Sequence, residues 1–140
     1  MTETVVPTGP VTDAVLVTLR GALAFDVGDN QAPPEPRSPS FPYATVYSLD
    51  DADRSGPYND GQSDVVHNIQ VTTVGETRDQ AQRLLDFAKS AMRADAAIVV
   101  ASRRVLLVEE VQGGGVERDD AKQPPYFYGI SIFDITTTPA

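Results

Sequence analysis

Hydrophobic and polar positions change their period within one stretch of the chain, from Ile69 to Met92. Between Val65 and Val74 apolar and polar residues alternate, which predicts a strand with one buried face and one wet face. After a single glycine the period becomes helical, and Thr77 with Gln80 predicts a capping box, in which the Thr77 hydroxyl meets the Gln80 amide and the Gln80 side chain reaches back. The predicted buried stripe of this helix comprises Ala81, Leu84, Leu85, Ala88 and Met92, with Phe87 and Ala91 flanking it.

A second helix is predicted near the start of the chain. Residues 1–11 contain two prolines and a glycine and show no hydrophobic period, so we expect a flexible or docking arm there. From Thr12 the spacing is helical, with Thr12 as the N-cap and Asp13 in the first turn. Its apolar stripe comprises Val15, Leu16, Leu19, Ala22 and Leu23 and should face a sheet.

Five prolines lie between Val27 and Pro42. They exclude a helix or a central strand there, because proline fixes φ and has no amide donor. We expect a stiff surface crossing, which either contacts a partner or serves as a rigid spacer. Three further strands are predicted, at residues 43–49, 104–111 and 126–136.

These elements follow the order α-β-β-α-β-β. The order predicts an α+β fold with a mainly antiparallel sheet of about four strands and two helices packed on one face. The three glycines at 113–115 end the third strand and are expected to form a flexible hairpin tip. A chain of 140 residues fits one domain, and we expect residues 12–137 to form it.

The composition excludes several classes of function. The formal net charge of -9 disfavours binding to nucleic acid through its phosphates, although it is compatible with a conduit that DNA slides past. The absence of cysteine excludes disulfides, thiolate zinc sites and cysteine nucleophiles. No apolar run approaches the roughly 20 residues that span a bilayer, and the N-terminus lacks the basic region of a signal peptide, so we expect no membrane association.

The segment from Asp51 to Gln62 has the spacing of a calcium loop, with oxygen ligands at its first, third, fifth and ninth positions and Gly56 at the turn. Two features count against calcium. Gln62 stands where a bidentate carboxylate is needed, and the flanking segments are predicted strands instead of helices. An exposed hairpin loop is therefore the favoured interpretation.

His67 is the only histidine, so any histidine-dependent triad or general base would have to use it. It shares the buried face of its strand with Val65 and Ile69, which is typical of a packed residue. The triple glycine is followed by neither Lys-Ser nor Lys-Thr, so it predicts no phosphate loop. We expect no enzyme and no cofactor.

Charged residues near the third and fourth predicted strands are the remaining candidates. Basic and acidic groups there could pair between copies of a ring, where one face of a subunit meets a different face of its neighbour. The alternative is a solvated strand end that contributes little energy. The candidate subunit-interface residues are Arg103, Arg104, Glu109, Glu110, Arg118, Asp119 and Asp120.

Five segments occur in a fixed order: FPYATVYSLDD, SGPYND, IQVTTVGETRDQAQRLLDFAKSAM, VERDD and PPYFYGISIFDITTTP. In this order they resemble the tail terminator (tail completion) proteins of long-tailed bacteriophages, over about residues 12–139. The resemblance implies an α+β subunit that is assembled in the host cytoplasm and forms a ring, expected to be a hexamer, on the head-proximal end of the virion tail. The ring would stop addition of the major tail tube protein and offer a surface to head-completion proteins. DNA would pass through its lumen without specific binding.

Function in such a ring rests on shape and charge, and the resemblance assigns no individual functional residue. Three other readings stay open. The chain could be another head-tail connector, such as a head-closure or neck protein, or a regulatory module that binds a small molecule or calcium. A hydrolytic enzyme that uses His67 is the third.

Overall fold

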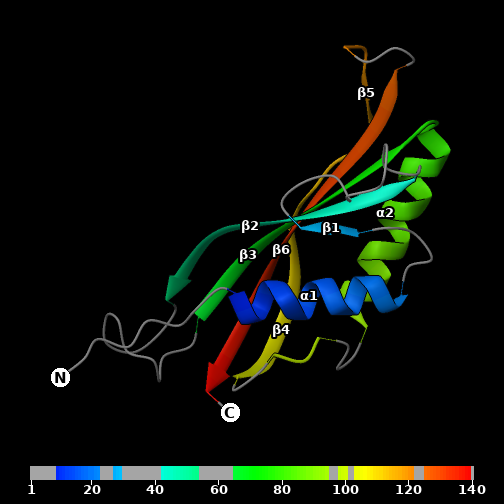
Figure 1. The fold of residues 1–140 in the computed structure, drawn as a ribbon. Helices are drawn as coiled ribbons and strands as arrows, with labels where there is room; N and C mark the ends of the chain where they lie inside the picture. The colour runs from blue at the N-terminus through cyan, green and yellow to red at the C-terminus, as the bar shows by residue number, and fades with distance from the viewer. Residues whose placement is uncertain are drawn as a thin grey trace.

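The computed structural model describes residues 9–22, 27–29, 42–53, 65–94, 98–100, 103–121 and 125–139. These residues form two layers, a six-stranded sheet and a pair of helices on one of its faces (Figure 1). In chain order the elements are α1 (Gly9–Ala22), β1 (Val27–Asp29), β2 (Tyr43–Asp53), β3 (Val65–Gly75), α2 (Arg78–Arg93), β4 (Arg103–Gly113), β5 (Glu117–Asp119) and β6 (Tyr126–Pro139).

The strands lie in the order β1-β2-β3-β6-β4, and β5 also pairs with β6. All pairs are antiparallel except β1 with β2. The predicted α+β class and the mainly antiparallel sheet are therefore confirmed. The prediction of about four strands is wrong, since β1 and β5 are additional and the order is α-β-β-β-α-β-β-β. Each of these two strands has three residues, too few for a hydrophobic period to appear.

Strand β1 lies at the start of the proline-rich segment, ahead of its first proline, and forms one edge of the sheet. The prolines do not exclude such a strand, because an edge strand pairs on one side only. Of the rest of that segment, residues 30–41 lie outside the described part of the chain. The predicted surface crossing is therefore untested there.

The expectation of a hairpin tip at residues 113–115 is wrong. Gly113 pairs with Ser131 and Glu117 pairs with Tyr128, so β4 and β5 follow one another along the same edge of β6. The glycines interrupt this edge and do not reverse the chain. The reversal lies between Asp119 and Tyr126, beyond β5.

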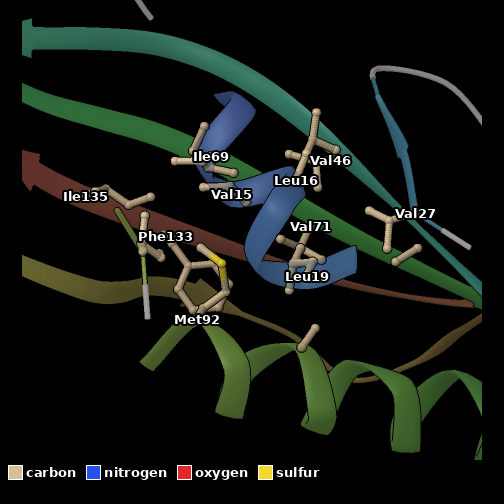
Figure 2. Close-up of a cluster of buried hydrophobic side chains, with 14 of the residues drawn as sticks. Val15, Leu16, Leu19, Val27, Val46, Ile69, Val71, Met92, Phe133 and Ile135 are labelled. Atoms are coloured by element: carbon tan, nitrogen blue, oxygen red, sulfur yellow. The ribbon is translucent and has the colours of Figure 1, made fainter. Parts of the chain in front are cut away.

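The core lies between the sheet and both helices (Figure 2). Val46 pairs with Val71, and the same alternation continues into β6, so these strands present one apolar face. The strand contribution comprises Val27, Ala44, Val46, Ile69, Val71, Phe133 and Ile135. The predicted stripe of α2 is confirmed, since Ala81, Leu84, Leu85, Ala88 and Met92 are all buried. In α1, Val15, Leu16 and Leu19 are buried as predicted, whereas Ala22 is exposed and Leu23 lies outside the described residues.

Helix α1 begins at Gly9, earlier than expected. Pro10 stands in its first turn, where a missing amide hydrogen costs nothing, so the arm predicted for residues 1–11 includes helix from Gly9 onward. Thr12 is consequently not the N-cap. Its hydroxyl lies inside the helix and shares a hydrogen bond with the Ser48 hydroxyl on β2.

The capping box of α2 is present with one difference. The Gln80 amide donates to the Thr77 hydroxyl over 3.1 Å, as predicted. The Gln80 side-chain carbonyl accepts from the amide of Glu76 over 2.9 Å, one residue before the cap. Gly75 makes the approach to the helix possible, because a Cβ there would lie 2.8 Å from the Ala81 backbone nitrogen.

Candidate assembly surface

Strand β4 forms the edge of the sheet opposite to β1 (Figure 1). Within the described part of the chain it pairs with β6 alone, so its outer row of backbone N–H and C=O groups has no strand partner there. Long edge strands promote association between chains unless their geometry or side chains prevent it. The features of β4 therefore bear directly on assembly.

The register between β4 and β6 shifts twice, between Val105 and Leu107 and again between Glu110 and Gln112. Such bulges twist an edge and interrupt its ladder, which disfavours simple extension of the sheet by a second strand. Contact through side chains is favoured instead. Leu106, Leu107 and Val111 are 49%, 52% and 47% exposed, and we refer to these three residues as the β4 apolar strip. Apolar side chains exposed in a row are typical of a contact surface.

The strip borders the face of the sheet that the two helices leave open. Side chains on this face form rows across the strands, for example Tyr47, Gln70 and Ile132. Gln112 is the β4 neighbour of Ile132, and Leu107 lies beside Thr136. Tyr47 is the aromatic residue in this row, and aromatic side chains are enriched at protein interfaces.

Two of the seven charged candidates serve the subunit itself. Arg103 donates from Nε to the Thr137 hydroxyl over 3.1 Å and from Nη2 to the Thr137 carbonyl over 3.0 Å. Glu110 accepts a short hydrogen bond from the Ser131 hydroxyl and lies 3.2 Å from Lys89 Nζ on α2. The Ser131 bond, aided by Lys89 and opposed by partial burial, lowers the pKa of the Glu110 carboxyl. Both residues therefore fasten β4 to the rest of the fold.

The other five candidates lie on the surface. Arg118 and Asp120 form an exposed ion pair with each other at 2.5 Å. Such a pair contributes little to stability. Asp119 accepts from the Ala121 amide over 3.0 Å in the turn after β5. Arg104 and Glu109 are exposed opposite Thr138 and Asp134 on the helix-free face. On β4 the two arginines lie at the start of the strand and the two glutamates near its end, and the remaining three charged candidates lie on β5 and in the turn after it.

His67 is fully buried on β3, as its position in the alternating pattern predicts. Its Nε2 lies 3.0 Å from the Thr137 hydroxyl, the same oxygen that accepts from Arg103. The contact joins β3, β6 and β4. This arrangement gives the histidine a packing role.

The predicted calcium loop is only partly described. Residues 51–53 continue strand β2, so the strand is longer than predicted, and residues 54–62 lie outside the described part of the chain. Among the residues that the structure describes, no group of three or more His, Asp or Glu side chains could hold a metal ion. None of the described helices is both long and apolar enough to cross a membrane.

The β4 apolar strip could not be recognised in the sequence. The run Val105 to Val108 contains four consecutive apolar residues, which is typical of a strand buried on both faces. The bulge at Leu106 changes which way the following residues point, and period-two reasoning does not detect it. Four of the predicted charged residues lie on this strand, and their role in an interface stays a prediction.

No protein-family model and no curated protein matches the sequence. Among solved structures, the chain is similar to one from the virion of the native gene transfer agent (GTA) particle. The TM-score is 0.71 and the identity 16%, and the match covers 94% of this chain and 96% of that chain. At this identity the likeness shows a common fold, which extends over almost the full length of both chains.

Proposed function

We propose that the chain is a structural protein of a phage-like virion and acts as a tail terminator. Copies would form a ring, expected to be a hexamer, on the head-proximal end of the tail, stop addition of tail tube protein and provide the joint to the head. The observation that supports this most is the fold shared almost end to end with a chain of the GTA virion. The order of sequence segments that resembles tail terminators gives the more specific role.

The proposed ring uses the two opposite edges of the sheet. The β4 apolar strip of one copy contacts the edge of the next copy that carries β1 and α1. Val17 of α1, 72% exposed, is the apolar side chain that this helix offers to such a contact. Because the two surfaces differ, the contact is heterologous and can close into a ring. Tail termination then follows from shape, since the ring covers the tube end without offering an identical end to the next tube subunit.

The net charge of -9 suits the passage of DNA, because a negative lumen repels phosphates and retains no nucleic acid. The proposal includes no catalysis. His67 would contribute only to packing, and replacement of His67 by a residue that keeps the fold should preserve biological activity.

The test is the substitution Leu107→Glu, with Phe87→Glu as the matched control. Both residues are 52% exposed, so neither change should unfold the subunit, but Phe87 lies on α2 and Leu107 in the strip. We expect Leu107→Glu to lower the oligomer mass measured by light scattering and to reduce tail joining seen by electron microscopy. Unchanged mass and normal tail joining in Leu107→Glu would overturn the proposed interface. Arg104→Glu tests whether charge contributes to the contact between copies. Arg103 is less suitable for this test, because it also donates to Thr137 within the subunit.

The same likeness also supports a neighbouring role, a head-closure or neck protein of the connector. Such a protein would contact the portal side of the joint. Electron microscopy of particles that lack the protein separates the two roles. Loss of a terminator gives overlong or unjoined tails, whereas loss of a head-closure protein leaves tail length unchanged.

A further inference from the structure

A hollow of about 220 Å³ lies where β4 ends and β5 begins. Gln112, the glycines 113–115, Glu117, Tyr128 and Ile130 line it. Tyr128 and Ile130 alternate with the buried Gly129 on β6, so both belong to the helix-free side of the sheet. The hollow is therefore open on the side where a neighbouring protein could approach.

The interrupted edge creates the hollow. Residues 114–116 have no partner on β6, because the pairing passes from Gly113 with Ser131 to Glu117 with Tyr128. Val116 is half-buried and lies on the helix side of the sheet. A Cβ placed on Gly129 would point to that side, where it would lie 2.9 Å from Cδ2 of Leu85 on α2 and 3.4 Å from Cγ2 of Val116. The preceding glycines have no side chains to fill the space on the opposite side.

The size of the hollow limits what can occupy it. Pockets for small organic ligands usually enclose roughly 300–1,000 Å³. The present hollow of about 220 Å³ is smaller and suits one inserted side chain. Single side chains that fill such pockets are often the residues that dominate a protein interface.

The lining selects for a cation. The Glu117 carboxylate accepts a 2.7 Å hydrogen bond from the Tyr128 hydroxyl, and this bond raises the pKa of Tyr128. Within the described residues no cation pairs with Glu117. The adjacent Arg118 pairs with Asp120 instead. A guanidinium group could stack on the Tyr128 ring and donate to the carboxylate, which an ammonium group does less well.

We infer that the hollow receives an arginine side chain of a different virion protein. The β5–β6 hairpin extends past the ends of both helices, away from the body of the subunit (Figure 1). The β4 apolar strip ends at Val111 and the hairpin extends beyond that residue, so we assign the hollow to a second kind of protein instead of the neighbouring copy. This inference rests on the proposed function, and it assigns the projecting end of the subunit to contact with a neighbour in the virion.

The test is an NMR titration of the full chain with N-acetyl-arginine methylamide, compared with its neutral isostere N-acetyl-citrulline methylamide. We expect the arginine derivative to shift the amide signals of residues 112–117 and 128–130, and the citrulline derivative to bind much more weakly. Glu117→Gln keeps an acceptor for Tyr128 and removes the charge, and should weaken binding about tenfold. Glu76→Gln is the control for charge, since Glu76 is exposed and lies before α2.

A second variant fills the hollow. A Cβ on Gly114 meets nothing within 4 Å, so Gly114→Leu should fold normally and abolish the shifts. Gly21→Leu adds the same side chain at an equally open position on α1 and should leave binding unchanged. Equal binding of the citrulline derivative, or full binding to Glu117→Gln or Gly114→Leu, would overturn the inference.

Light scattering distinguishes the occupant. We expect Glu117→Gln to leave the oligomer mass unchanged. A lower mass would identify the occupant as a second copy of this chain and overturn the assignment to a different protein. Failure of the proposed ring would appear separately, as an unchanged mass in Leu107→Glu, and does not alter the NMR result.

Discussion

Single hydroxyl groups fasten strand β4 to the rest of the sheet. The Thr137 oxygen accepts from Arg103 of β4 and also contacts Nε2 of His67 on β3. The Ser131 hydroxyl donates to Glu110, which also pairs with Lys89 of α2. Charged residues on an edge strand can thus be structural, and the sequence does not distinguish them from interface residues. The exposed Arg104 and Glu109 are their immediate neighbours.

The lowered pKa of Glu110 predicts a dependence of stability on pH. A carboxyl whose pKa is depressed in the folded state stabilises that state fully above the unfolded pKa, and the contribution disappears as the pH falls through the folded value. We expect Glu110→Gln to be less stable than the unmodified chain at neutral pH. On acidification the free energy of unfolding should fall less in Glu110→Gln than in the unmodified chain. Chemical denaturation at several pH values measures this. Glu109→Gln, one residue away and exposed, is the control, and an identical pH profile in both variants would contradict the assigned role.

At the scale of elements, periodicity predicts what is long and regular. Helix α2 and strand β3 each extend over eleven residues or more, and the residues predicted to be buried in them are buried. The capping hydroxyl of α2 is also confirmed, whereas Val66 of β3 is buried although the alternation predicts a wet position there. Strands β1 and β5 have three residues each, and they form because they pair with a longer neighbouring strand, β2 or β6. The start of α1 was missed because proline and glycine usually mark irregular structure, although both can stand in a first helical turn.

The turn between β3 and α2 gives a prediction at this scale. Gly75→Ala would place a Cβ 2.8 Å from a backbone nitrogen of α2, where relaxation must move the helix. We expect a loss of about 1–3 kcal/mol in the free energy of unfolding. Gly21→Ala, in open space on α1, should instead raise it by about 0.5–1 kcal/mol. Urea denaturation measures both, and equal effects of the two changes would show that the close approach is unimportant.

In the described part of the molecule, the sheet has two different edges and one face that carries no helix. The sequence predicted the α+β class, the side of β3 that is buried and the strand that carries the candidate interface. It did not predict the β4 apolar strip or the hollow beside Glu117, because both depend on irregular pairing with β6. Local interruptions of pairing have no hydrophobic period, so sequence patterns do not reveal them.

Assembly should respond to salt in a direction that identifies its driving force. Copies that each carry a net charge of -9 repel one another, and salt of about 1 M shortens the screening length to about 3 Å. An interface formed by the β4 apolar strip should therefore strengthen with salt, and the oligomer mass from light scattering should rise. If the mass falls instead, attraction between charged groups dominates, as pairing of the arginines with carboxylates between copies predicts.

The central pairing of β3 with β6 has a consequence for how the chain folds. It joins residues far apart in sequence, Val65 with Thr137 and Gly75 with Phe127. The β2–β3 and β4–β6 pairs are closer in sequence and can each form early, as two half-sheets that must then find one another. Until they do, β3 and β6 are both open to a wrong partner, so the slow step of folding coincides with the greatest risk of aggregation.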